Sequence, residues 1–349
     1  MNLSEIAISN GIETELHFNE IPSDVTVKDW FRFWFQSYKR ESIRSVTKRK
    51  YYTDFAHICI SELKNMRMVD VNRAIAQKYM NNYGETRSKL TFYDHWQRMR
   101  SLYNDAMIDG VVKTNPFKNI TPKFKEQKLN IKELKELRDR KEWLEADEYN
   151  KFTYKVMFWL EENLNSNKDK SIVMFYMLIL ILIKTGARFS EVLGITKDDI
   201  LWDSNELYIN KSFDYKEKND FDMTKNIMSV RKIVVDESTM KLLTKYLDWI
   251  ERNKVETEKG ALFIEKDIPI YNSTVNNRLN KLFRSLDIEP ITVHKLRHSH
   301  ASLLLSNNIP LTVIAKRLGH SDTTMITRVY GHLLKQVEEN GNNKILGLI

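Results

Sequence analysis

Residues 292–332 read TVHKLRHSHASLLLSNNIPLTVIAKRLGHSDTTMITRVYGH, and the rest of the chain is organised around this stretch. His294 and Arg297 are three residues apart, so a helix presents both side chains on one face. A guanidinium and an imidazole on one face can bind an anionic group and transfer a proton beside it. Leu318-Gly319-His320 adds a second histidine, and Tyr330 adds a hydroxyl that becomes a nucleophile only when it is activated.

A second group of residues lies upstream, in Thr185-Gly186-Ala187-Arg188-Phe189-Ser190-Glu191. It follows the apolar run 172–183, which is too short to span a bilayer and predicts a buried helix. Gly186 is expected to end that helix, which puts Arg188 at a helix junction with Glu191 one turn further on. A buried arginine beside a carboxylate can be purely structural. Two arginines, two histidines and a tyrosine in this chain indicate catalysis instead.

The ordered motifs resemble the tyrosine recombinase (phage integrase) family. They stand here as Ala187-Arg188-x-x-Glu191, His294-x-x-Arg297-His298, Leu318-Gly319-His320 and Thr327-Arg328-Val329-Tyr330. The resemblance covers roughly residues 24–335. It implies an integrase of a phage or integrative element, a site-specific recombinase that cleaves and rejoins DNA through a covalent 3′-phosphotyrosyl intermediate during integration and excision.

The resemblance also implies a role for each matching residue. Tyr330 is the nucleophile, Arg188 and Arg297 stabilise the phosphate, His294 assists proton transfer, His320 hydrogen-bonds the phosphate, and Glu191 supports the site. Lys225 matches the family's catalytic hairpin lysine, the general acid, while Lys216, Lys218 and Lys232 remain alternatives. Because a covalent intermediate conserves the bond energy, we expect no metal and no cofactor, and the chain has no GxxxxGK[ST] phosphate loop.

Composition bounds the class of protein independently of the motifs. The 349 residues are 42% hydrophobic and 29% charged, which predicts a globular chain of two or three domains. The single cysteine, Cys59, excludes a disulfide framework. Residues 1–20 have no basic segment followed by an apolar one, so no secretory signal is predicted. We therefore expect a cytoplasmic location.

The positive charge is concentrated in one region. Residues 24–125 contain 20 Lys and Arg against 10 Asp and Glu, whereas residues 1–23 contain four Glu and no Lys or Arg. The net charge of the whole chain is +8. A basic region joined to a nearly neutral one predicts that the first binds double-stranded DNA and the second acts on it.

We predict a mainly α fold with a small antiparallel β-sheet. Residues 1–23 are predicted to be a tail or short appendage, 24–117 a helical-bundle core-binding domain, 118–141 a linker, 142–332 the catalytic domain and 333–349 a C-terminal tail. In the bundle, Thr26-x-x-Asp29 is a capping box, and the aromatic residues from Trp30 to Tyr38 are expected in the core. Arg44, Lys48, Arg49 and Lys50 start its second helix and are the candidate DNA-binding residues.

In the catalytic domain, residues 206–210 predict a strand, and residues 221–224 and 229–235 predict a hairpin that turns at 225–228. A further short strand is expected at 261–264. The hairpin is the segment that carries Lys225.

Other readings of the same residues point to other classes of protein. Residues 309–326 resemble a helix-turn-helix, which favours a DNA-binding regulator without catalysis. His294 and His298, at i,i+4, have a spacing that binds zinc in metal-dependent nucleases, although residues 292–332 contain one acid, Asp322. A type IB topoisomerase shares the covalent chemistry. The regulator leaves Arg188, Arg297 and Tyr330 without a role.

The resemblance further implies how the protein assembles. We expect a homo-oligomer that binds inverted core sites as a dimer and joins two duplexes as a tetramer, with the tail after Tyr330 docking on a neighbouring protomer. Many integrases carry an arm-binding domain of some sixty residues before the core-binding domain, and with only residues 1–23 ahead of the predicted core-binding domain we expect none here. The resemblance also names an accessory DNA-bending or excision factor as a candidate partner.

Overall fold

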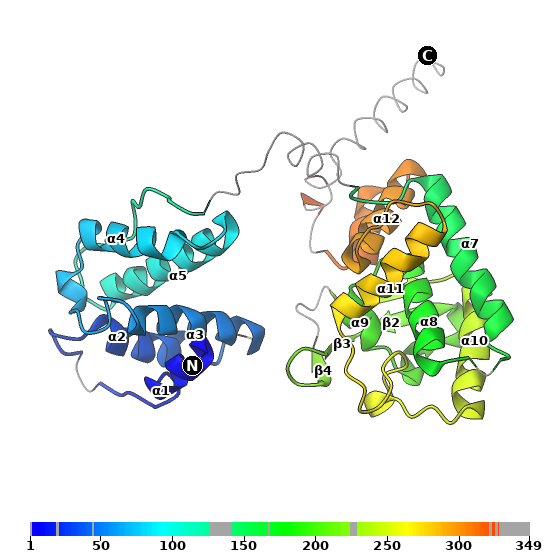
Figure 1. Ribbon diagram of the computed structural model, residues 1–349, viewed down its shortest axis with the longest axis horizontal. Coiled ribbons are helices and arrows are strands. Elements are labelled where there is room, and N and C mark those ends of the chain that lie inside the picture. The colour runs from blue at the N-terminus through cyan, green and yellow to red at the C-terminus, as the bar shows by residue number, and fades with distance from the viewer. Residues whose placement is uncertain are drawn as a thin grey trace, which may run out of the picture. The chain divides into compact units, whose positions relative to one another are not determined.

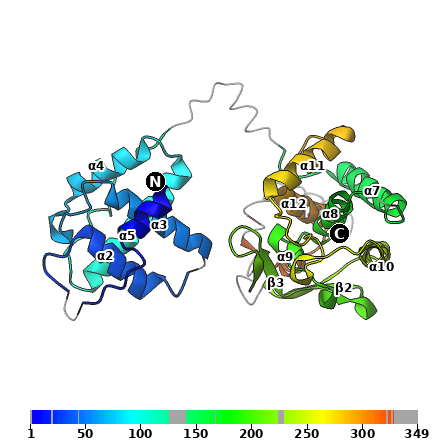
Figure 2. The same ribbon diagram turned by 60° about the horizontal axis from the view of Figure 1, so that its bottom comes forward.

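The computed structural model describes residues 2–18, 21–43, 45–125, 141–166, 168–223 and 229–320, together with Thr323, Thr324 and Thr327. The chain divides into two compact units, residues 1–136 and 137–349. Each unit has its own hydrophobic core. Figures 1 and 2 show the helices and strands of each unit. The predicted fold class, mainly α with small antiparallel sheets, is confirmed.

The first unit is a helical bundle. Its helices are α1 (Leu3–Ser9), α2 (Val27–Trp34) continued by a π-helical turn (Phe35–Lys39), α3 (Ser45–Cys59), α4 (Arg73–Gly84) and α5 (Lys89–Ile108), with a 3₁₀ turn at Met68–Asp70. Thr26 caps α2 as predicted, because its hydroxyl accepts a hydrogen bond from the backbone N–H of Asp29 at 3.1 Å. The two tryptophans of α2 are fully buried, and their indole N–H groups donate to α5.

Three predictions for the first unit differ from the structure. Residues 3–9 form a capped helix that packs on α3, with Ala7 fully buried, so the N-terminal segment is part of this unit's core. Residues 118–125, predicted to start the linker, also pack here, since Ile120 is buried in the same core. Tyr38 is exposed, and its hydroxyl donates to Asp109 at 2.9 Å.

The second unit surrounds one long apolar helix. Its helices are α7 (Ala146–Asn163), α8 (Lys170–Thr185), α9 (Phe189–Leu193), α10 (Glu237–Arg252), α11 (Asn272–Ser285), α12 (Val293–Ser306) and α13 (Leu311–Leu318). Every residue from Met177 to Ile183 is buried, because α8 packs against α7, α9, α10 and α12. Figure 1 shows α8 enclosed by these neighbours. Within the described ranges, no helix is long and apolar enough to span a membrane.

Two small antiparallel sheets complete this unit. One has the order β1 (Ile200–Leu201), β2 (Glu206–Ile209), β5 (Arg231–Val234), and the other pairs β3 (Lys211–Asp214) with β4 (Asp220–Met223). The hairpin predicted between 221–224 and 229–235 is therefore wrong in its pairing. Strand β4 returns along β3, where Phe213 faces Phe221, and β5 pairs with β2.

Residues 261–264 were expected to form a strand, and they do not. Ala261, Leu262, Phe263 and Ile264 are all buried in the core of the second unit, but as irregular backbone. The apolar run correctly indicated burial, but its backbone forms a turn, and Leu262 donates a backbone hydrogen bond to the Ile195 carbonyl at 3.0 Å.

Candidate active site

The site is built where two helices of the second unit end. Helix α8 ends at Gly186, with φ +65°, and α13 ends at Gly319, with φ +72°. Both glycines adopt the left-handed conformation that commonly terminates helices. The carbonyl groups at such ends carry partial negative charge and attract cations.

Arg297 joins these two helix ends. It lies on α12 one turn after His294, and the residue is only 7% exposed. Its Nη1 donates to the Gly186 carbonyl at 2.9 Å, and its Nη2 donates to the Leu318 carbonyl at 2.8 Å. The same Nη2 is 2.8 Å from Nε2 of His320. The structure therefore brings Arg297 and His320 into direct contact.

Arg188 and Glu191 form the second part of the site. Arg188 is the N-cap of α9, and its backbone N–H and Nη1 donate to the Glu191 carboxylate at 2.9 and 2.6 Å. The Glu191 side chain is 4% exposed, whereas that of Arg188 is 35% exposed. Glu191 thus holds Arg188 from the buried side and leaves part of the guanidinium accessible to a ligand.

His294 lies within reach of both arginines. Burial lowers the pKa of His294 below its ordinary value, and the charges of Arg297 and Arg188 lower it further. The imidazole is therefore neutral at physiological pH and can accept a proton. The neighbouring His298, whose ring centroid lies 5.3 Å from that of His294, has its pKa lowered to about 4, mainly by burial.

Two arginines that the sequence analysis missed support the site from inside. Arg317 donates to Nε2 of His300 at 2.9 Å and to the Lys184 and Val234 carbonyls at 3.0 Å each. Arg231 donates to Glu191, Ser229 and Arg317. Arg231 had a detectable signal, because it alternates with Ile233 and Val235 on the apolar face of a strand.

Several predicted residues lie outside the part of the chain that the structure describes. These are the nucleophile Tyr330, the general acid Lys225 and the DNA-binding candidate Arg44. The alternatives to Lys225 are described: Lys216 and Lys218 are exposed in the turn between β3 and β4. Lys232 is exposed on the face of β5 opposite to Arg231.

The described basic candidates of the first unit lie on α3. Lys48 is half-buried, while Arg49 and Lys50 are exposed, in the first turns of that helix. Lys50 forms an ion pair with Asp94 at 2.9 Å. Because these three residues are consecutive on one helix, their side chains point in different directions around it, and their role in DNA binding stays a prediction.

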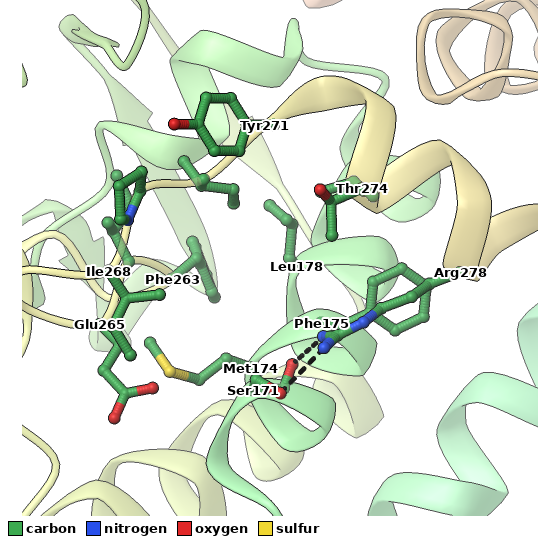
Figure 3. Close-up of a pocket in the computed structure, with 14 residues that line it drawn as sticks. Ser171, Met174, Phe175, Leu178, Phe263, Glu265, Ile268, Tyr271, Thr274 and Arg278 are labelled. Carbon is green, nitrogen blue, oxygen red and sulfur yellow. Dashed lines mark hydrogen bonds between the residues drawn. The ribbon is translucent and has the colours of Figure 1, made fainter.

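A pocket of the second unit lies apart from these residues (Figure 3). It has a volume of about 120 Å³ and is walled mainly by apolar side chains from the start of α8, residues 263–271 and the start of α11. Arg278 closes one side by donating to the Ser171 carbonyl at 2.8 Å. Of the predicted catalytic residues that the structure describes, namely Arg188, His294, Arg297 and His320, none lines it.

The zinc-nuclease reading gains no support from the described residues. Among them, no three His, Cys, Asp or Glu side chains are grouped closely enough to hold a metal ion. The charges that act on His294 are those of Arg297 and Arg188, an environment that attracts anions, whereas those that act on His298 include Arg297, Lys295 and the carboxylate of Glu142.

Comparison with known proteins agrees with the geometry. Residues 124–337 match the model of the phage integrase family. A tyrosine recombinase XerC-like protein of Caldanaerobacter subterraneus is 24% identical over 95% of this chain and 85% of its own length. The ICEBs1 integrase of Bacillus subtilis is 22% identical over 85% of this chain and 73% of its own length.

Solved structures show the same fold. The Tn1549 transposon integrase in complex with transposon right end DNA matches 88% of this chain and 95% of that chain, with a TM-score of 0.65 and 18% identity. A λ integrase dimer bound to a COC′ core site matches 87% of this chain and 77% of that chain, with a TM-score of 0.53 and 16% identity.

The match to the family model, over more than half of the chain, defines the class of protein as a DNA strand-cleaving and rejoining enzyme. The chain belongs to the phage integrase family. It is a tyrosine-type site-specific recombinase for the integration and excision of a mobile element.

Proposed function

We propose that Arg188, Arg297, His294 and His320 bind the scissile phosphate of DNA and that Tyr330 attacks it. The observation that carries this proposal is the Arg297 guanidinium, which joins the ends of α8 and α13 and contacts His320. Two arginine charges also bear on His294. A phosphodiester anion fits such a set of donors, and the charge that develops on its oxygens during attack is stabilised by them.

In the proposed step the Tyr330 oxygen forms a bond to phosphorus and gives its proton to His294. The bond between phosphorus and the 5′ oxygen breaks, and Lys225 protonates that oxygen as it leaves. The product is a 3′-phosphotyrosyl link and a free 5′ hydroxyl. Rejoining is the reverse reaction, with the 5′ hydroxyl as nucleophile. Because one phosphodiester replaces another, the step balances without an external energy source.

The DNA partner and the assembly are further parts of the proposal. We propose that the protein binds inverted core sites as a dimer, acts as a tetramer on two duplexes, and docks its C-terminal tail on a neighbouring protomer. The λ integrase dimer on its core site supports this arrangement. So does the XerH recombinase, which was solved on a palindromic substrate. An accessory bending or excision factor belongs to the same proposal.

The proposed roles are tested by separating cleavage from binding. Arg188→Ala and Arg297→Ala are expected to lower single-turnover cleavage of a nicked core-site duplex about 100-fold or more, because each removes donors to the transition state. Affinity for the same DNA is expected to change only a few-fold. Arg278→Ala, which removes an equal charge at the pocket of Figure 3, is the control and should retain cleavage. Equal losses in all three variants would contradict the proposal.

The docking of the tail has its own test. Truncation after Leu334 is expected to abolish assembly of two duplexes while a single site is still bound. If the truncated protein assembles and cleaves like the full chain, the proposed docking is wrong.

The alternative function is a helix-turn-helix regulator without catalysis. Helix α13 does pack on α12 through Ile314, Ala315 and Leu318, as the first helix of such a motif would. Its carbonyl end, however, is occupied by Arg297 and Arg231. Residues 321–326, the predicted recognition helix, lie mostly outside the described residues.

A further inference from the structure

Arg231 is a buried arginine that belongs to none of the motifs used above. It is the first residue of β5, and its side chain is only 4% exposed. Each guanidinium nitrogen donates one hydrogen bond, and the three acceptors come from separate segments. They are the Arg317 carbonyl at 2.6 Å, the Ser229 carbonyl at 2.8 Å and the Glu191 carboxylate at 2.9 Å.

The Glu191 contact links Arg231 to Arg188. One carboxylate oxygen of Glu191 accepts from Nη1 of Arg188, and the other accepts from Nη2 of Arg231. The two arginines are therefore held by one buried carboxylate. Because Glu191 cannot move without changing both ion pairs, the position of Arg188 depends on Arg231.

The Arg317 contact links Arg231 to the turn that precedes His320. Gly319 lies directly against the guanidinium, since a Cβ atom at Gly319 would be 2.8 Å from Nη1 of Arg231. The absence of a side chain at Gly319 thus lets the turn pack onto Arg231. A change in the guanidinium is transmitted to the backbone next to His320.

The Ser229 contact fixes one end of the segment that connects β4 and β5. Ser229 is itself buried. Lys225 lies four residues earlier in this segment, outside the described residues. Arg231 therefore bonds the backbone two residues before its own position, at the first described residue after Lys225.

Stability alone does not explain an arginine at this position. Residues 233 and 235 on the same face of the strand are Ile233 and Val235, both buried. Replacing buried ion pairs by apolar side chains is often neutral or stabilising for a protein. A residue with three separate donors in a fixed planar arrangement is suited to orientation.

We propose that Arg231 is a positioning residue for DNA cleavage, which acts through Glu191 on Arg188 and through the turn at Gly319 on His320. It contacts neither the DNA nor the reacting atoms in this proposal. The inference rests on the proposed function, because it assumes that Arg188 binds the scissile phosphate. It predicts that changes at Arg231 affect the chemical step and leave DNA binding nearly unchanged.

The test is a double-mutant cycle on the full-length protein. Single-turnover cleavage of a saturating nicked core-site duplex is measured for wild type, Arg188→Lys, Arg231→Gln and the double variant, and the Kd for DNA is measured separately. Residues that act as a unit give non-additive losses, whereas independent effects multiply. Arg317→Gln replaces Arg231→Gln in a parallel control cycle, since that side chain bonds His300 and backbone carbonyls but not Glu191.

We expect Arg231→Gln to lower cleavage about 30-fold or more, with Kd within about threefold of wild type. The variant with both Arg188→Lys and Arg231→Gln should cleave about as fast as Arg188→Lys alone. In the control cycle, the losses in cleavage rate of Arg188→Lys and Arg317→Gln should multiply. A multiplicative Arg231 cycle, or an Arg231→Gln rate within about threefold of wild type, would overturn the inference.

Arg231→Lys provides a second variant in case Arg231→Gln does not fold, which circular dichroism and a thermal melt will show. Lysine keeps the charge but lacks the planar set of donors, so it should remain impaired at least about tenfold. Full activity in Arg231→Lys would also overturn the inference. If the proposed function itself were wrong, Arg188→Lys alone would cleave DNA at the wild-type rate. This result distinguishes failure of the proposed function from failure of the inference about Arg231.

Discussion

Glu191 is the shared counter-charge of two arginines, the partly exposed Arg188 and the buried Arg231. Burial raises the pKa of its carboxyl, but the charges and hydrogen bonds of Arg231 and Arg188 outweigh burial and hold that pKa below its ordinary value. The carboxylate is consequently ionised in the folded protein at neutral pH. Its removal leaves two partly or fully buried cations without their shared counter-charge.

Glu191→Gln is expected to lower the free energy of unfolding by about 3 kcal/mol at neutral pH, because breaking a buried ion pair leaves an uncompensated charge. Since the folded pKa is depressed, the stabilisation is present above the unfolded pKa and is lost as the pH falls through the folded pKa. The difference between wild type and variant should therefore be constant above about pH 5 and shrink below it. Urea titrations at several pH values measure this difference, and a gap that widens in acid would contradict the account.

His294, as the proposed proton acceptor, is expected to set the pH dependence of the reaction. Its lowered pKa keeps the imidazole neutral to a lower pH than an ordinary histidine. Cleavage at subsaturating DNA, which reports the free enzyme, is expected to stay level from about pH 8 to 6.5 and to fall only in more acidic buffer. His294→Gln should lower the plateau about 100-fold and remove the acidic fall.

His298→Gln is the matched control for that experiment. Its imidazole has a pKa of about 4, so it does not change charge in the tested range. The variant should keep the acidic fall of the wild type. An unchanged acidic fall in His294→Gln would mean that another group accepts the proton.

At the scale of elements, the helix ends determine the site. Gly186 combines a positive φ with tight packing, since a Cβ atom there would be 2.7 Å from Cδ2 of His300 and 2.9 Å from Cδ2 of Leu318. Its carbonyl receives Arg297. The end of α8 therefore needs glycine for its conformation and for the close approach of α12 and α13.

Gly186→Ala is expected to destabilise the protein by at least about 3 kcal/mol and to lower cleavage, because conformational strain and steric overlap add. Gly260→Ala is the matched control: Gly260 has φ +82°, and a Cβ atom there meets nothing within 4 Å. Gly260→Ala therefore measures the cost of the left-handed conformation alone, which should lower the free energy of unfolding by about 1 kcal/mol. Denaturant unfolding of both variants compares the two effects, and equal destabilisation would show that packing at Gly186 is unimportant.

The sequence predicts those elements whose pattern is local. The apolar run of α8, its glycine end and the pairing of His294 with Arg297 on one helical face all follow from short-range rules, and the structure has them. The partner of a strand is not a local property. The turn predicted at 225–228 does not indicate whether residues 221–224 pair with the strand before them or with the strand after them. Phe213 and Phe221 face each other across β3 and β4, a contact visible only in three dimensions.

The supporting residues of the site were harder to predict for the same reason. Arg188 and Arg297 are found by motif, whereas Arg231 and Arg317 act through carbonyl groups far away in the chain. Alternation on β5 marked Arg231 as buried, but its three partners depend on how β5, α9 and α13 meet. The roles of Tyr330 and Lys225 stay predictions.

At the scale of the whole molecule, positive charge is concentrated in a different region from the candidate catalytic residues. The basic residues concentrate in 24–125, while the candidate catalytic residues lie after residue 187. Electrostatic binding by one region and chemistry in another predict that salt weakens binding more than it slows cleavage of bound DNA.

Lys48→Ala is expected to reduce the slope of log K against log salt concentration by about 1, because one phosphate contact and its released counterion are lost. Lys241→Ala, an exposed lysine paired with Glu237 on α10, is the equal-charge control and should leave the slope unchanged. Fluorescence anisotropy over a salt series measures both. Identical slopes for Lys48→Ala and wild type would remove α3 from the proposed DNA surface.

Trapping the intermediate tests whether Tyr330 is the nucleophile of a covalent DNA cleavage. Wild type and Tyr330→Phe are mixed with a nicked duplex carrying a candidate core site, without metal or ATP, and separated after denaturation in SDS. The account predicts a protein–DNA adduct with wild type and none with Tyr330→Phe, although both bind the duplex. An adduct that persists in Tyr330→Phe, or tight binding by wild type with no adduct, would contradict it.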